Sequence, residues 1–164
     1  MTIKREAILD LREKLMVAEL QRLSGVKPNT TDEVRDYIRG GVKMPLAKIE
    51  IIKGQSQEYK STLLKSIHDG LVNALSMKEG NCSQRLYELD EFCFVRTPGK
   101  TEKFTLIELT IFSGRSPEVK KEVIVEITRL LGERLQIAPP DVFIVINDQP
   151  RENWGFRGIQ ASEL

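Results

Sequence analysis

The chain of 164 residues is short of the two side chains that most often hold metals or carry nucleophilic chemistry, because it has one histidine and two cysteines. Cys82 and Cys93 lack the spacing of metal ligands, so we expect unpaired thiols and no metal site. His68 is alone in a segment with helical periodicity. A zinc site or a nucleophile–His–acid triad needs partners that this composition does not offer.

An excess of one charge and a long apolar run are also missing. Lys plus Arg number 25 and Asp plus Glu number 24, which gives a net charge of +1. Without a basic stripe, nucleic acid is not expected as a partner. No apolar run is long enough to span a bilayer, and the first residues lack the apolar core of a secretory signal. We therefore expect a cytoplasmic protein that does not bind membranes.

The chain does contain an internal repeat with a period of 60 residues. Residues 45–60 and 105–120 share Gly, Ser, Glu and Lys in register. The matched pairs are Gly54/Gly114, Ser56/Ser116, Glu58/Glu118 and Lys60/Lys120, followed by the apolar pairs Leu64/Ile124, Ile67/Ile127, Leu71/Leu131 and Leu75/Leu135. A long period that occurs in only two copies indicates a duplicated supersecondary unit rather than a solenoid, which needs at least three repeats.

Each copy predicts a strand, a turn and a helix. Apolar and polar residues alternate over 47–51 and again over 107–111, which is the period of a half-buried strand. A glycine then permits a sharp turn, and Ser56 or Ser116 is a good helix N-cap. Pro117 occupies a first helical position, where its missing N–H costs nothing. The predicted buried stripes are Leu64, Ile67, Leu71 and Leu75 in the first helix and Val123, Ile127, Leu130 and Leu131 in the second.

A second strand is predicted after each helix. Residues 87–95 alternate loosely, whereas 142–146 form a continuous apolar run that is typical of a strand buried on both faces. The polar loop 96–103 joins the halves. The prediction for 45–164 is therefore an α+β fold in which two β-α-β units form one mixed four-stranded sheet with both helices on one face.

Two groups of residues resemble the tautomerase superfamily, which includes 4-oxalocrotonate tautomerase and malonate semialdehyde decarboxylase. The first group is Met44-Pro45-Leu46 before a strand and a Gly-x-Ser turn in each β-α-β unit. The second group is the tail segments 111–116, 141–146, 151–158 and 161–163, which are similar to the longer, fused members. The resemblance covers residues 44–164. It implies the same fold, a homotrimer, and chemistry that requires no metal or organic cofactor.

The resemblance also implies keto–enol isomerisation of a small carboxylate-bearing substrate, with an amino-terminal proline as the base. The candidate base is Pro45. A free α-amino group has a pKa near 8, and burial favours its neutral form, so a prolyl amine can act as a general base near neutral pH. Arg115 is the candidate cation for the carboxylate or the developing oxyanion, because it precedes a helix N-terminus. The alternative for Arg115 is a solvated turn arginine.

Three further residues are candidates for substrate binding. Arg85 can supply another cation and Tyr87 can polarise a carbonyl, although both also fit as ordinary residues at the start of a strand. Trp154 can form a wall of the site or simply pack. The first copy has Gln55 where the shorter tautomerases have an arginine, which argues against 4-oxalocrotonate chemistry. The decarboxylase-like members carry an Asp shortly before a Tyr, and its absence here argues against decarboxylation.

Residues 1–43 leave two alternatives open, because an internal proline nitrogen is an amide and cannot act as a base. In the first, Met44 is the true start and is removed to expose Pro45; codons for Arg39-Gly40-Gly41 can resemble a bacterial ribosome-binding site. In the second, 1–43 form a helical hairpin extension with Leu9, Met16, Leu20 and Leu23 on one face. The extension would then be a docking arm, and the protein a non-catalytic binding module.

Overall fold

The computed structural model describes residues 45–77, 82–156 and 158–163. The helical hairpin predicted for 1–43 lies outside these residues. None of the helices in these three segments is long and apolar enough to cross a membrane.

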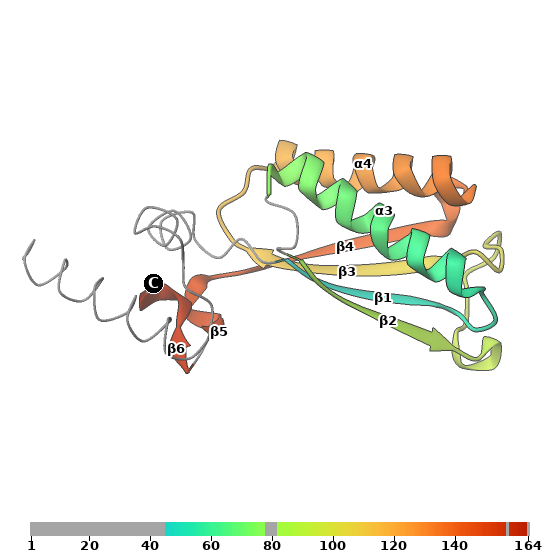
Figure 1. Cartoon of the computed structure of the whole chain (residues 1–164), viewed down its shortest axis with the longest axis horizontal. Coiled ribbons are helices and arrows are strands. Elements are labelled where there is room, and N and C mark those ends of the chain that lie inside the picture. The colour runs from blue at the N-terminus through green and yellow to red at the C-terminus, as the bar shows by residue number, and fades with distance from the viewer. Residues whose placement is uncertain (1–44, 78–81, 157, 164) are drawn as a thin grey trace, which may run out of the picture. The chain divides into compact units, whose positions relative to one another are not determined.

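Four strands form one sheet in the order β2-β1-β3-β4, and two long helices cover one of its faces (Figure 1). β1 is parallel to β2, β3 is parallel to β4, and the two pairs meet through antiparallel pairing of β1 with β3. The elements are β1 (Leu46–Ile52), α3 (Gln57–Leu75), β2 (Ser83–Leu89), β3 (Thr105–Phe112), α4 (Pro117–Leu135) and β4 (Val142–Gln149), followed by the short strands β5 (Gly155–Phe156) and β6 (Ile159–Gln160). The predicted α+β fold class is confirmed.

The helices begin where the capping residues predict. The Ser56 hydroxyl accepts a hydrogen bond from the Tyr59 backbone N–H at 3.1 Å, and the Ser116 hydroxyl accepts one from the Val119 N–H at 3.4 Å. Pro117 is the first residue of α4. Both helices end at a residue with left-handed backbone conformation, Ser76 and Gln136. The two copies therefore use the same local devices to start and stop a helix.

The hydrophobic core lies between the sheet and the helices. Alternate residues of β1 and β3 point into it, and the predicted α4 stripe is buried in full, while Leu64 in the α3 stripe is only partly buried. The two helices are in close contact at Gly70. A Cβ at Gly70 would lie 2.7 Å from the Ile127 Cγ1 and 3.2 Å from its Cα. Gly70 therefore sets the distance between α3 and α4.

The strand predicted over 87–95 is wrong in its position. β2 spans Ser83–Leu89 and ends before a 3₁₀ turn at Glu91–Cys93. The apolar residues after Asp90 predicted a strand, but they form no hydrogen-bonded pairing with another strand of the described sheet. Phe92 is 83% exposed and Val95 is 91% exposed.

The prediction that 142–146 are buried on both faces is also wrong for this chain. β4 is an edge strand, with Phe143 51% and Val145 37% exposed. Only Val142, Ile144 and Ile146 pack against the core. An apolar run gives the same sequence signal whether its second face is covered by the chain itself or left open, so the sequence did not distinguish the two cases.

The repeat extends further than the sequence pattern indicated. Lys60 pairs with Glu88, and Lys120 pairs with Asp148 at the equivalent positions. The 3₁₀ turn Glu91–Cys93 has its counterpart in Arg151–Asn153. Each turn lies 60 positions from its partner in the sequence. The duplication therefore runs to Phe94 in the first copy and Trp154 in the second. Each residue of one copy can be compared with the residue 60 positions away in the other.

Replacing Gly70 by alanine tests the close helix contact. The added methyl group meets the Ile127 side chain and backbone, so we expect the free energy of unfolding to fall by about 1–2 kcal/mol in spite of the better helix propensity of alanine. Gly132→Ala is the matched control, because its Cβ would meet only the Ile137 carbonyl at 3.6 Å. Urea unfolding measures both variants. A Gly70→Ala protein as stable as Gly132→Ala would contradict the packing argument.

Candidate active site

Strand register brings the start of β1 beside the end of β3. Leu46 pairs with Thr110, so Pro45, which directly precedes Leu46, lies at the end of the sheet where β3 finishes at Phe112. Pro45 is buried, and its carbonyl accepts a hydrogen bond from the Ser83 N–H at 3.2 Å. Arg115 follows Phe112 in the turn before α4. The two residues predicted to be catalytic therefore lie at the same end of the sheet.

This proximity depends on the duplication. Within one copy, Pro45 and the turn residue Gln55 lie at opposite ends of β1, a strand of 7 residues. At about 3.3 Å per residue they are more than about 20 Å apart. Only the antiparallel pairing of β1 with β3 brings the turn of the second copy to the start of the first. Of the two repeat-related turn positions, 55 and 115, only 115 therefore lies at the same end of the sheet as residue 45.

Arg115 is held against the backbone. Its Nη1 donates a hydrogen bond to the Phe112 carbonyl at 3.0 Å, and the side chain is partly buried. Burial lowers the pKa of the Arg115 guanidinium, and the nearby carboxylate of Asp148 acts in the opposite direction. The guanidinium stays charged at neutral pH because an arginine pKa starts so high. Asp148 is itself paired with Lys120, so a cation remains beside the N-terminus of α4.

Trp154 forms an apolar wall at this end of the sheet. Its ring centroid lies 4.6 Å from that of Phe112, with the planes tilted by 47°. The indole N–H donates to the Gln149 carbonyl at 3.4 Å, and Trp154 is only 8% exposed. The tryptophan therefore packs on the last residue of β3. The packing role considered for Trp154 is thus observed, and its role in lining the substrate site stays a prediction.

Arg151 was missed by the sequence reasoning. Its guanidinium carbon lies 5.4 Å from the centre of the Phe112 ring. Arg151 is exposed and begins the 3₁₀ turn that precedes Trp154. The available signal was the 60-residue period, which aligns Arg151 with Glu91 and so marks a change of charge between the copies.

Arg85 and Tyr87 lie on β2, on the face of the sheet that the helices leave open. Arg85 pairs in register with Lys48, and Tyr87 with Glu50. Both are exposed, and the Lys48 ammonium lies 5.6 Å from the Tyr87 ring. Along β2, Tyr87 is four residues beyond Ser83, about 13 Å from the Pro45 end. The substrate-binding roles of Arg85 and Tyr87 stay predictions.

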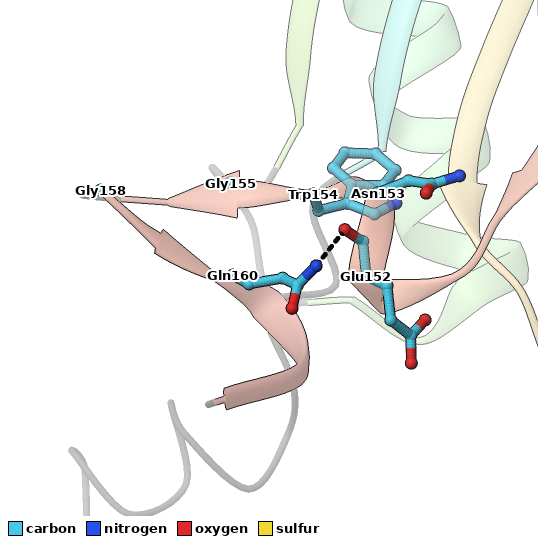
Figure 2. A pocket seen from close by; sticks show the side chains of 6 residues that line it. All are labelled: Glu152, Asn153, Trp154, Gly155, Gly158 and Gln160. Carbon is cyan, nitrogen blue, oxygen red and sulfur yellow. Dashed lines mark hydrogen bonds between the residues drawn. The ribbon is translucent and has the colours of Figure 1, made fainter.

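The C-terminal segment forms a shallow hollow, and Trp154 is one of the residues that line it (Figure 2). It is lined by Glu152, Asn153, Trp154, Gly155, Gly158 and Gln160. The Gln160 amide donates to the Glu152 carbonyl at 2.6 Å and closes one side of it. Neither Pro45 nor Arg115 lines this hollow. Trp154 lines the hollow and also contacts Phe112.

Cys82 directly precedes Ser83 and lies near the Pro45 end of β2. Burial raises the pKa of its thiol to about 11, and a hydrogen bond with the Gln84 side chain acts in the opposite direction. Cys93 is exposed. Over 45–77, 82–156 and 158–163, no three His, Cys, Asp or Glu side chains are grouped so that they could hold a metal ion.

Comparison with known proteins identifies the family. A family profile described as "Tautomerase enzyme" matches residues 81–157. A 2-hydroxymuconate tautomerase of Comamonas testosteroni is 42% identical over 57 residues, which cover 35% of this chain and 90% of that protein. The probable tautomerase YusQ of Bacillus subtilis (strain 168) is 27% identical over 126 residues, which cover 74% of this chain and 99% of that protein. The chain belongs to the tautomerase superfamily.

Solved structures agree on the fold. Malonate semialdehyde decarboxylase superposes with a TM-score of 0.65 at 20% identity, covering 71% of this chain and 94% of that one. A fused 4-OT described as an asymmetric trimer also gives a TM-score of 0.65, at 21% identity, covering 72% of this chain and 97% of that one. At these identities the likeness shows the fold alone.

The different surroundings of the two cysteines predict different thiol reactivity. With a pKa of about 11, Cys82 carries on the order of one thiolate in a thousand at pH 8, and it is also half-buried. We expect a thiol-reactive dye to label Cys93 rapidly and Cys82 slowly. Cys93→Ser should remove the fast phase, and Cys82→Ser should leave it intact. Equal rates for the two thiols would show that Cys82 is not desolvated.

Proposed function

We propose that this protein is an enzyme that catalyses keto–enol isomerisation of a small carboxylate-bearing substrate, with the amine of Pro45 as the base. The observation that carries the proposal is that Pro45 lies at the same end of the sheet as Arg115. The 42% identity with a protein named 2-hydroxymuconate tautomerase supports this reaction class over others in the superfamily.

The proposal requires a chain that begins at Pro45. Within a longer chain the Pro45 nitrogen is an amide without a basic lone pair. As the first residue it becomes a secondary amine with a pKa near 8 before any environmental shift. Burial disfavours the protonated amine, and a cation at the same end of the sheet acts in the same direction, so the pKa of the amine would fall toward the range in which a base works best at neutral pH.

The proton transfer is balanced within the substrate. The prolyl amine accepts the proton of the enol O–H and returns it to a carbon of the conjugated chain. One O–H bond breaks, one C–H bond forms, and no other reactant is consumed. Arg115 offsets the negative charge that develops on the substrate oxygen or carboxylate, while Phe112 and Trp154 keep water from one side. This sequence of steps needs no metal or organic cofactor.

A homotrimer is part of the proposal. The sheet face opposite the helices exposes Tyr87, Phe143 and Val145, and β2 and β4 are the edge strands of the sheet that the described residues form. Exposed apolar side chains and free strand edges favour association with further copies. The fused 4-OT structures described as trimers have the same fold.

The role of Pro45 is tested by comparing three proteins: the full chain, the chain beginning at Pro45, and that shorter chain with Pro45→Ala. We expect the shorter chain to ketonise phenylenolpyruvate and the full chain to be inactive. The rate of ketonisation should fall on the order of tenfold or more in Pro45→Ala, because this variant replaces the secondary amine with a primary amine of different basicity and position.

Pro98→Ala, in the exposed loop between the two halves, is the control and should keep its activity. Intact mass of the protein from its native host shows which form occurs there. Equal activity in the full chain and the shorter chain would contradict the mechanism. A native mass that matches the full chain would instead favour the alternative, a binding module with residues 1–43 as its docking arm.

Arg115→Ala tests carboxylate recognition. We expect kcat/KM for phenylenolpyruvate to fall by on the order of a hundredfold, as for a lost charge-assisted bidentate contact, while a neutral enol such as that of phenylacetaldehyde is affected much less. Gln55→Ala changes the repeat-related turn position and should leave both rates unchanged. Equal losses on the acid and the neutral enol would assign Arg115 a structural role.

A further inference from the structure

Two apolar side chains after β2 are exposed, although the backbone that carries them is held in place. Phe92 is 83% exposed and Val95 is 91% exposed. Between them, the Phe94 N–H donates to the Glu91 carbonyl at 3.3 Å, and the Phe94 ring centroid lies 5.4 Å from that of Phe104. We call Phe92 and Val95 the apolar knob. It is presented to solvent on an ordered turn.

The second copy shows that this turn does not need apolar residues at the two positions. The equivalent 3₁₀ turn, Arg151–Asn153, forms with Glu152 in place of Phe92 and Gly155 in place of Val95. Single apolar residues at a surface are ordinary, but two of them close together on one ordered turn, where folding does not require them, are typical of an interaction site.

The second copy has a hollow at the place that corresponds to the knob. Glu152 and Gly155 both line it, together with Trp154 (Figure 2). Its volume is about 370 Å³. Pockets of about 300–1,000 Å³ hold drug-sized ligands, so there is room for two apolar side chains. A Cβ at Gly155 or Gly158 would meet no described heavy atom within 4 Å, so the glycines leave the hollow open.

The knob cannot reach the hollow of its own chain. β2 runs parallel to β1 and β4 runs parallel to β3, while β1 and β3 are antiparallel. The knob follows the end of β2 and the hollow follows the end of β4, so they lie at opposite ends of the sheet (Figure 1). A strand of 7 residues separates these ends by about 20 Å. Knob and hollow can therefore meet only between two copies of the chain.

The charged residues beside the two features are complementary. Glu91 and Arg96 form an ion pair next to the knob, and the Glu91 side chain is 72% exposed. Arg151 and Glu152, next to the hollow, are both exposed. Each end therefore offers one carboxylate and one guanidinium to the other. Such complementarity favours the encounter of two ends and fixes their register.

We propose that the apolar knob of one copy inserts into the hollow of the next copy. This inference rests on the homotrimer of the proposed function and not on its reaction. A contact between two different surfaces is head-to-tail, and it closes into a ring when the rotation between copies permits. Three such contacts join the three subunits. Phe92 is the anchor, because an aromatic side chain in a concave site is the usual centre of binding energy in an interface.

Two single variants of the full chain test the two halves of the contact. Phe92→Ser removes most of the knob, and Gly155→Trp fills the hollow from a position whose Cβ has no described neighbour within 4 Å. We expect each variant to raise the dissociation constant of the assembly about tenfold or more, measured by sedimentation over a series of concentrations. Val125→Ser is the control, because it removes a 55% exposed apolar side chain from α4 and should change nothing. Circular dichroism shows that each variant is folded.

Mixing the two variants tests whether knob and hollow meet each other. The Phe92→Ser chain keeps its hollow and the Gly155→Trp chain keeps its knob, so one intact contact forms per pair. We expect a dimer in the mixture that is absent from either variant alone at the same concentration. A mixture without this dimer would overturn the inference.

The other outcomes separate the contact from the proposed function. A trimer that is unaffected by either variant keeps the homotrimer and overturns the contact. Weakening by Phe92→Ser alone would indicate that knobs meet knobs, and this also overturns it. An unmodified chain that stays monomeric overturns both the contact and the homotrimer. Activity of the chain beginning at Pro45 is measured separately, so its loss or presence does not decide the contact.

Discussion

The antiparallel pairing of β1 with β3 is the interaction on which the rest of the molecule depends. It joins two β-α-β halves into one sheet, and it aligns the two helices on the same face so that a single core forms between them. It also reverses one half relative to the other. For this reason the start of the first strand lies at the same end of the sheet as the turn that follows the third, and so do Pro45 and Arg115, although 70 positions separate them in the sequence.

The contact between the two helices is the second constraint. Gly70 has no side chain, and a Cβ there would lie too close to the side chain and the backbone of Ile127. A helix pair this close packs the stripes of α3 and α4 tightly against the sheet. Salt bridges such as Asp69 with Arg134 lie at the outer surface of the same contact, where they contribute little compared with the buried apolar residues.

Much of this fold could be predicted from local patterns. The two-residue alternation located β1 and β3, and Ser56, Ser116 and Pro117 located the helix starts, because these signals depend on neighbouring residues only. The failures involve long-range context. The apolar residues after Asp90 predicted a strand because the sequence does not show whether a neighbouring strand is there to pair with. For the same reason it did not show that one face of β4 is exposed. Arg115 was predicted from its turn, whereas Arg151 reaches Phe112 only through the folded tail.

The correspondence between the two halves has a further consequence, for how such a protein changes over time. In an assembly of identical single-copy subunits, one mutation in the gene alters every equivalent position at once. Here the equivalent positions are encoded separately, so Gln55 and Arg115, or Glu91 and Arg151, were free to diverge while both turns kept their shape. Duplication within the chain thus released each turn from its counterpart, so that one turn could acquire new side chains while the other kept its own.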